Sequence, residues 1–168
     1  MARKFELKKR TPEEASAGVA NFMVNAYATL VDEVEERIGY DEGRKLAYDA
    51  YHKFVTNICT PEWEAMKGEN PPTAQDYVNW LLKDQPLGYD VDIIEESPDS
   101  VQLRFNCCLW ATHFVGHGKG DTGLIFCEVD YDMIKEFNEI TGANLVFERS
   151  KVLMDGSDHC NHHIYVKK

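Results

Sequence analysis

The hydrophobic pattern of the chain changes its period near the middle, and this change limits the folds that the chain can adopt. Up to residue 84, apolar residues recur every three or four positions, as on one face of a helix. From residue 85 onward, short alternating runs typical of strands appear on both sides of further helical sequence. Helices followed by the order ββ-αα-ββ predict an α+β fold, with a helical half packed on an antiparallel sheet of two β-hairpins.

Three helices are expected in the first half. Thr11-Pro12-Glu13-Glu14 combines an N-cap threonine, a proline at the first helical position and a glutamate three residues after the cap. This helix should end at Gly39 and turn one apolar stripe to the core: Val19, Phe22, Met23, Ala26, Leu30, Val34 and Ile38. A second helix is expected over about 41–58, an irregular segment over 60–72, and a third helix over 73–83.

Two hairpins are expected in the second half, formed by strands 89–95 and 100–108 and by strands 144–153 and 159–166. Helices over 110–115 and 123–139 are expected between the hairpins, and a break of the longer helix near Asp130 is left open. Alternation along 100–108 places Cys107 with the core residues and Cys108 on the opposite face, with Asn106. Along the last strand, alternation places His162 on the same face as Cys160.

Length and charge narrow the class of protein. A chain of 168 residues predicts one domain, with a polar tail over 1–10, a helical half over 11–84 and a sheet-containing half over 85–168. The net charge of −11 argues against nucleic acid and anionic membranes as partners. No apolar run reaches the length of a membrane span, and no secretory signal is expected. Acidity alone does not name a substrate; a small-molecule substrate or ligand is implied by the motifs described below, and a homodimer is left open.

The five cysteines form an odd count without a C-x-x-C pair, which favours reduced thiols and a cytoplasmic location. Cys108, Cys127 and Cys160 each have polar or aromatic neighbours in the sequence and are the candidates for chemistry. Cys59 and Cys107 are better explained as small buried apolar residues.

Two other patterns are weaker. The segment Gly116-His117-Gly118-Lys119-Gly120 lacks the spacing of a phosphate-binding loop and is interpreted as a connection between helices. His113 and His117 have metal-ligand spacing, but Gly116 interrupts their helix. No cofactor is assured. Zinc remains an alternative, and its ligands would be Cys108, Cys127, Cys160 and His162.

Five motifs of the second half occur in the same order as in a known family. They are Asn106-Cys107-Cys108-Leu109-Trp110, Phe126-Cys127-Glu128-Val129-Asp130, Phe137-Asn138, Phe147-Glu148-Arg149 and Asp155-Gly156-Ser157-Asp158-His159-Cys160. Through them the chain resembles the L-2-amino-thiazoline-4-carboxylic acid hydrolase family over roughly residues 85–168. Leu109 stands where the family has proline, and Cys108 is preferred to Cys107 as the family's cysteine.

The resemblance implies hydrolytic opening of a cyclic amidine, in which water adds to the carbon between ring nitrogen and sulfur and N-carbamoyl-cysteine forms. The catalytic candidates are Cys127, Asp130, Cys108 and Cys160, and the substrate-binding candidates are Asn106, Trp110, His113, Asn138 and Asp158.

Two mechanisms suit these side chains. In the first, a thiolate attacks and a carboxylate moves protons, and Cys127 with Asp130 is the natural pair because their i, i+3 spacing shares a helix face. In the second, the cysteines hold a metal that activates water. Asp130 has an alternative interpretation as the N-cap of a helix that starts at Tyr131.

Two other classes of protein remain open. The order of elements is also similar to that of vinyl-reductase-associated domains, which bind small molecules without obvious catalysis. A structural zinc domain is the second alternative, and it would unfold on addition of a chelator.

Overall fold

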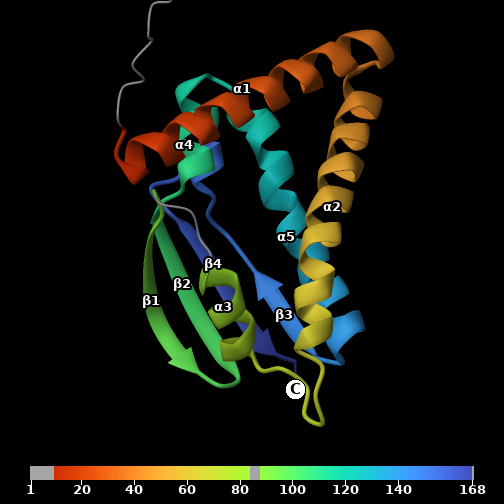
Figure 1. Ribbon diagram of the computed structural model, residues 1–168, viewed down its shortest axis with the longest axis vertical. Helices are drawn as coiled ribbons and strands as arrows, with labels where there is room; N and C mark the ends of the chain where they lie inside the picture. The colour runs from red at the N-terminus through yellow and green to blue at the C-terminus, as the bar shows by residue number, and fades with distance from the viewer. Residues whose placement is uncertain (1–9, 84–87, 168) are drawn as a thin grey trace, which may run out of the picture.

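The computed structural model describes residues 10–83 and 88–167. The helices are α1 (Pro12–Ile38), α2 (Tyr40–Ala65), α3 (Ala74–Lys83), α4 (Leu109–Gly116) and α5 (Gly120–Thr141). The strands are β1 (Asp90–Ser97), β2 (Ser100–Cys107), β3 (Leu145–Glu148) and β4 (Cys160–Val166), with a short 3₁₀ turn at Leu153–Asp155 (Figure 1). The tail expected over 1–10, apart from Arg10, and the boundary expected at 84–85 lie outside the described residues.

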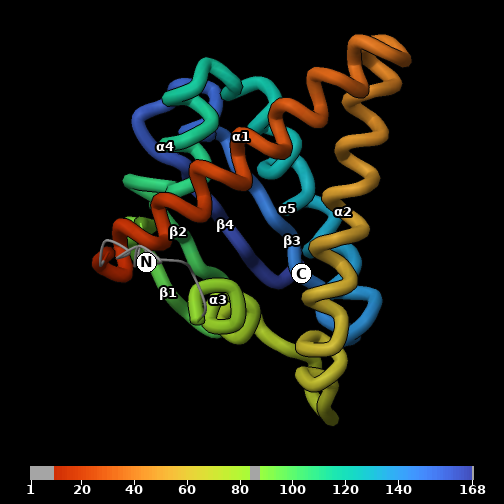
Figure 2. The backbone as a smooth tube through the Cα atoms, turned by 45° about the horizontal axis from the view of Figure 1, so that its top comes forward, coloured from red at the N-terminus to blue at the C-terminus, as the bar shows by residue number. Residues whose placement is uncertain are grey.

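The four strands form one antiparallel sheet in the order β1-β2-β4-β3. Its inner face carries cross-strand pairs such as Val101 with Ile164 and Phe105 with Cys160. Helices α2, α3 and α5 supply the other side of the core, including the fully buried Trp63 and Phe137. Figures 1 and 2 show α3 against the sheet and α1 crossing the opposite end of the molecule. The predicted α+β fold with two hairpins is confirmed.

Helix α1 begins as its sequence predicts. The Thr11 hydroxyl accepts a hydrogen bond from the Glu14 amide at 3.2 Å, and the Glu14 carboxylate accepts one from the Thr11 amide at 3.0 Å. This reciprocal pair satisfies two amide groups that the first turn would otherwise leave without partners.

The stripe of α1 that was expected in the core is largely exposed. The buried residues of α1 are Ala20, Val24, Ala28 and Val31, whereas Val19 is 60% exposed and Phe22 73% exposed. Both sets have helical spacing. The set with small residues faces α4 and α2 because alanine lets helix backbones approach closely. The prediction for this stripe is therefore wrong.

Helix α2 continues past its predicted end at residue 58, through Pro61, to Ala65. Proline removes one helical hydrogen bond, which normally ends or kinks a helix. Here the extra turn buries Trp63 completely, with its ring 5.9 Å from Phe137 and 5.4 Å from Trp80. Burial of the Trp63 indole stabilises the helix by about as much free energy as Pro61 destabilises it, so tertiary packing overrides the tendency of proline to end the helix.

Two boundaries in the second half also differ from the prediction. Helix α5 is continuous through Asp130, so neither a break nor an N-cap occurs there. Strand β3 ends at Glu148 rather than continuing to 153, and the 3₁₀ turn follows. None of the helices within the described residues is both long and apolar enough to cross a membrane.

We expect Gly123→Ala to lower the free energy of unfolding by about 1–3 kcal/mol, measured by chemical denaturation. Gly123 lies in α5, where an added Cβ would come within 2.8 Å of Phe114 Cγ and would also collide with Met154. Gly116 has open space around it and provides the matched control, Gly116→Ala. Equal stability of the two variants would contradict this packing.

Candidate active site

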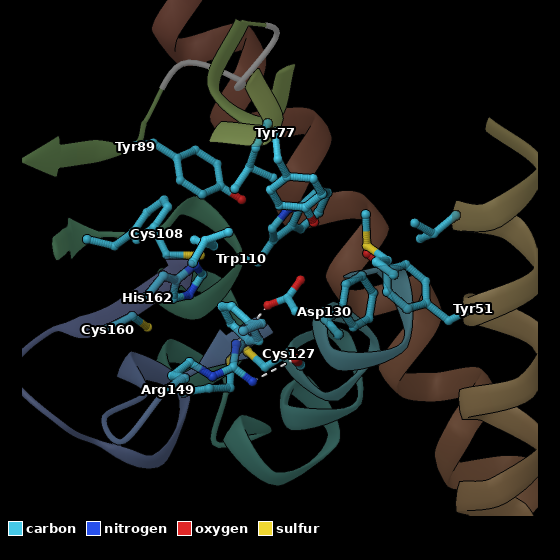
Figure 3. Close-up of a pocket in the computed structure, with 18 residues that line it drawn as sticks. Tyr51, Tyr77, Tyr89, Cys108, Trp110, Cys127, Asp130, Arg149, Cys160 and His162 are labelled. Carbon is cyan, nitrogen blue, oxygen red and sulfur yellow. Dashed lines mark hydrogen bonds and ion pairs between the residues drawn. The ribbon is translucent and has the colours of Figure 1, made fainter. Parts of the chain in front are cut away.

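A pocket of about 240 Å³ lies between the inner face of the sheet and helices α2, α3 and α5 (Figure 3). Its walls are mostly aromatic and aliphatic, and its polar groups are few. The polar and sulfur-bearing groups are Cys108, Cys127, Asp130, Arg149, Cys160 and His162. The main aromatic groups are Tyr51, Tyr77, Tyr89, Phe105, Trp110, Phe126 and Phe147.

An irregularity in β2 brings Cys108 to this pocket. Asp90 pairs with Cys107 but Val91 pairs with Phe105, so Asn106 is an extra residue in the strand. An extra residue reverses the alternation beyond it. Cys108 therefore lines the pocket beside Phe105, while Cys107 lines only a second, more open hollow next to Thr112, which Cys108 also borders. The sequence assigned these two cysteines to the opposite faces, and this assignment is corrected.

Cys108 occupies the N-cap position of α4. Its side chain forms no capping hydrogen bond with the first turn of the helix. Burial raises the pKa of the Cys108 thiol, and the nearby amides of Ala111 and Trp110 and the hydroxyl of Tyr89 oppose this rise. Amides at a helix start stabilise negative charge, so the position favours a thiolate more than burial alone would allow.

Asp130 and Arg149 form an ion pair inside the pocket, with Arg149 Nη1 2.7 Å from Asp130 Oδ2. Arg149 Nη2 donates to the backbone oxygen of Cys127 at 2.7 Å, and both contacts are drawn in Figure 3. The Arg149 side chain is 4% exposed, and its guanidinium carbon lies over the rings of Tyr131 and Phe147, 5.2 and 5.4 Å from their centroids. Burial raises the pKa of Asp130 to about 6, although the charge and hydrogen bond of Arg149 oppose the rise. Asp130 therefore changes its charge near neutral pH.

The other two thiols have fewer hydrogen-bond donors around them than Cys108 has. Burial raises the pKa of Cys127, and the charge of Asp130 raises it further. Burial also raises the pKa of Cys160, whose sulfur accepts the Leu153 amide at 3.0 Å. Both thiols are therefore uncharged at neutral pH.

His162 lies on the inner face of β4 with Cys160, as the alternation predicts. Its ring contacts Phe105 and Phe147, with centroids 4.6 and 5.0 Å away. Burial, together with the nearby charge of Arg149, lowers the pKa of His162 to about 3. The imidazole is neutral at physiological pH.

The four side chains suggested as zinc ligands line the same pocket but do not form a ligand set. Among residues 10–83 and 88–167, no three His, Cys, Asp or Glu side chains are arranged to hold a metal ion. Cys160 is directed to a backbone amide and His162 packs between rings. The donors present therefore do not fit the tetrahedral geometry of zinc.

Two predicted substrate-binding residues lie near the pocket but not in its lining. Asn106 donates to Asp92 at 2.8 Å, because the irregularity in β2 turns it away. His113 lies on α4, and its Nε2 is buried without a hydrogen-bond partner among the described residues. The structure does not support either as a contact to a molecule in this pocket.

Two further candidates have structural roles. Asn138 donates to the Leu145 carbonyl at 2.8 Å and accepts from the Leu145 amide at 2.9 Å, so it joins α5 to β3. Asp158 is exposed and pairs with Lys151 at 3.1 Å and His159 at 2.8 Å. Neither lines the pocket, so the pocket gives no support to their assignment to substrate, which stays a prediction. Trp110, by contrast, is in the lining.

Arg149 and Tyr89 were not among the candidates from the sequence. A signal for Arg149 was present, because alternation from Leu145 and Phe147 places it on the inner face. A charged residue at an inward position needs a buried partner, and Asp130 supplies it. For Tyr89 we find no comparable signal in the sequence.

The fold and the pocket define an α+β protein with a mostly apolar pocket, lined by three thiols and a half-buried carboxylate. The model of the L-2-amino-thiazoline-4-carboxylic acid hydrolase family matches residues 20–164, so the chain belongs to this family. The family name indicates hydrolase activity in the broad sense and leaves the substrate of this chain open. No curated protein matches the chain at a significant level.

The chain is similar to solved structures at low sequence identity. Trafficking protein particle complex subunit 3 from Naegleria fowleri, covalently bound to palmitic acid, is 12% identical, with a TM-score of 0.51. The match covers 89% of this chain and 96% of that one. The Fe(II) unliganded H-NOX protein from K. algicida is 10% identical, with a TM-score of 0.39 and coverage of 91% and 93%. The first of these shows a common fold.

Proposed function

We propose that the chain hydrolyses a small cyclic amidine, with Cys108 as nucleophile and Asp130 as the group that moves protons. The observation that carries the proposal is their presence in one apolar pocket, with Cys108 at the amide-lined start of α4. Family membership supports a hydrolase of this general kind.

The choice among the three thiols follows from their surroundings. Cys127, which spacing alone favours, lies inside α5, where the backbone amides are already used by the helix. The sulfur of Cys160 is engaged by Leu153. Cys108 has free amides nearby that strengthen their contact as negative charge develops on sulfur.

The first step forms a bond between Cys108 Sγ and the amidine carbon. The Asp130 carboxylate takes the thiol proton, and the carbon–sulfur bond of the ring then breaks. The departing ring sulfur receives that proton from Asp130. The product of this step is an isothiourea on Cys108 that holds the whole opened substrate, with a free thiol at its other end.

The second step consumes one water molecule. Asp130 takes a proton from the water, whose oxygen bonds to the same carbon. The bond to Cys108 breaks, and its sulfur recovers the proton. The released product is a urea that bears a thiol, and the enzyme returns to its starting state.

The ion pair with Arg149 fixes the orientation of Asp130 and keeps its pKa from rising further. A protonated amidine is a planar cation, and Asp130 is the acidic residue among those that line the pocket. The aromatic walls exclude bulk water, which strengthens these charge interactions.

The experiment is an NMR assay of the full chain with an excess of 2-amino-thiazoline-4-carboxylate and of neutral 2-aminothiazolines. We expect many equivalents of a thiol-bearing urea to form per protein molecule from at least one compound. Failure to turn over any member of this panel would contradict the proposed reaction.

We expect kcat/KM to fall as the pH decreases through about 6, because Asp130 must be ionised to accept a proton and its pKa is raised to about 6. His162, with a pKa near 3, stays neutral over this range and does not contribute. A pH profile from 4.5 to 8 measures the effect. In the variant Asp130→Asn, kcat/KM should be lower by about 100-fold or more and should no longer decrease as the pH falls through about 6. If the variant showed the same decrease at low pH, Asp130 would be excluded as its cause.

A second candidate function is binding of an apolar small molecule without turnover. The observation that favours it is the mostly apolar lining, together with a fold shared with a protein whose structure holds covalent palmitic acid. It predicts stoichiometric binding or a stable adduct instead of repeated product release. The NMR assay separates the two because only catalysis yields product in excess of protein.

A further inference from the structure

The outer side of α1 carries an apolar stripe, formed by Val19, Phe22, Met23, Ala26 and Leu30. Their spacing places them on one face of the 27-residue helix. Val19, Phe22 and Leu30 are 60%, 73% and 61% exposed, and Met23 is 44% exposed. Figure 1 shows α1 crossing the top of the molecule, and in Figure 2, where the top is turned forward, α1 runs in front of the other elements.

The area of the stripe matches one side of a stable protein interface. With roughly 150–200 Å² for a fully exposed large apolar residue, the stripe presents about 450 Å² of apolar surface. A standard interface covers about 800 Å² per partner, slightly more than half of it apolar. A contiguous patch of this size on a soluble protein marks an interaction site.

We infer that this stripe is the interface of a homodimer, in which α1 of one copy packs antiparallel against α1 of a second copy. A two-fold axis at Ala26 makes the stripe complementary to itself. Phe22 of each copy then faces Leu30 of the other, one helical turn from the axis. The small side chain of Ala26 lets the two helices approach closely at their crossing point.

The charges along α1 favour this orientation. The C-terminal half of α1 carries Asp32, Glu33, Glu35 and Glu36, and the net charge of the chain is −11. A parallel pair would place these acids against each other. The antiparallel pair opposes them to the neutral segment around Gly18 and brings Arg37 near Glu13 of the second copy.

The test is sedimentation equilibrium of the full chain at tens of micromolar. We expect the native protein to have twice its chain mass of 19.2 kDa, and Phe22→Glu and Leu30→Glu to have the mass of one chain. The matched control is Ile94→Glu on β1, which is 59% exposed and should stay dimeric. Circular dichroism checks that each variant is folded. A native monomer, or a folded dimer in both α1 variants, would overturn the inference.

A second measurement locates the axis without disturbing the stripe. Under mild oxidation, Ala26→Cys should give a disulfide-linked dimer on a non-reducing gel. Ala50→Cys, at an exposed position of α2, should give none beyond the native background. Equal cross-linking of the two variants would contradict an axis at Ala26.

Discussion

Cys108→Ala is expected to lower kcat by at least about a thousandfold, because removal of a nucleophile leaves only binding and electrostatic contributions. The pocket would keep Asp130, Arg149 and its aromatic walls, so the substrate should still bind. The measurement is the steady-state rate of urea formation by NMR. The change in KM should be small compared with the change in kcat.

The matched control for this variant is Cys107→Ala. Cys107 is the adjacent residue and the same chemical group, but it does not line the pocket that holds Asp130 and faces the hollow beside Thr112 instead. We expect its kcat to stay within about twofold of the native value, since surface changes away from a site have small effects. Comparable loss in both variants would show that a general disturbance of the β2–α4 junction, and not loss of the nucleophile, lowers the rate.

Arg149→Met is expected to lower the free energy of unfolding at pH 7.5 by about 1–3 kcal/mol, because it leaves the half-buried carboxylate of Asp130 without its partner. It also removes the hydrogen bond to the Cys127 carbonyl and the cation–π contacts with Tyr131 and Phe147. Urea denaturation of both proteins measures the difference.

The pH dependence of this loss has a definite sign. The folded-state pKa of Asp130 is already above its ordinary value, at about 6, and removal of Arg149 raises it further. A carboxyl whose pKa is raised on folding destabilises the protein progressively as the pH increases above about 4. The loss of unfolding free energy caused by Arg149→Met should therefore be smallest near pH 4 and increase toward pH 8. When Asp130→Asn is also present, this increase with pH should disappear. A loss of unfolding free energy that does not depend on pH would contradict an ion-pair origin.

Local signals were sufficient for much of the fold. The capping box at Thr11 and Glu14 set the start of α1, and alternating apolar residues set β2 and β4. The end of α2 could not be predicted, because the burial of Trp63 that carries the helix past Pro61 depends on residues distant in the sequence. The prediction of the buried face of α1 failed for a related reason. The buried and the exposed apolar residues of α1 both have helical spacing, and only the helices packed against α1 distinguish them.

The part of the site that depends only on helix geometry could be predicted from the sequence. The spacing of Cys127 and Asp130 implied a shared face, and both line the pocket. The position of Cys108 depends on one extra residue in β2, which alternation cannot reveal. The structural role of Asn138 could not be predicted, because an amide that joins two backbone segments looks the same in sequence as one that binds a substrate.

Rapid-quench mass spectrometry of the intact protein during turnover of a cyclic amidine tests the central claim most directly. The account predicts a transient increase equal to the full mass of the substrate, located by digestion on the peptide that contains Cys108, and its decay as substrate is consumed. The same experiment with Cys108→Ala should show no such adduct. Steady turnover with no adduct on the native protein, or an adduct on Cys127 or Cys160 instead, would contradict the account.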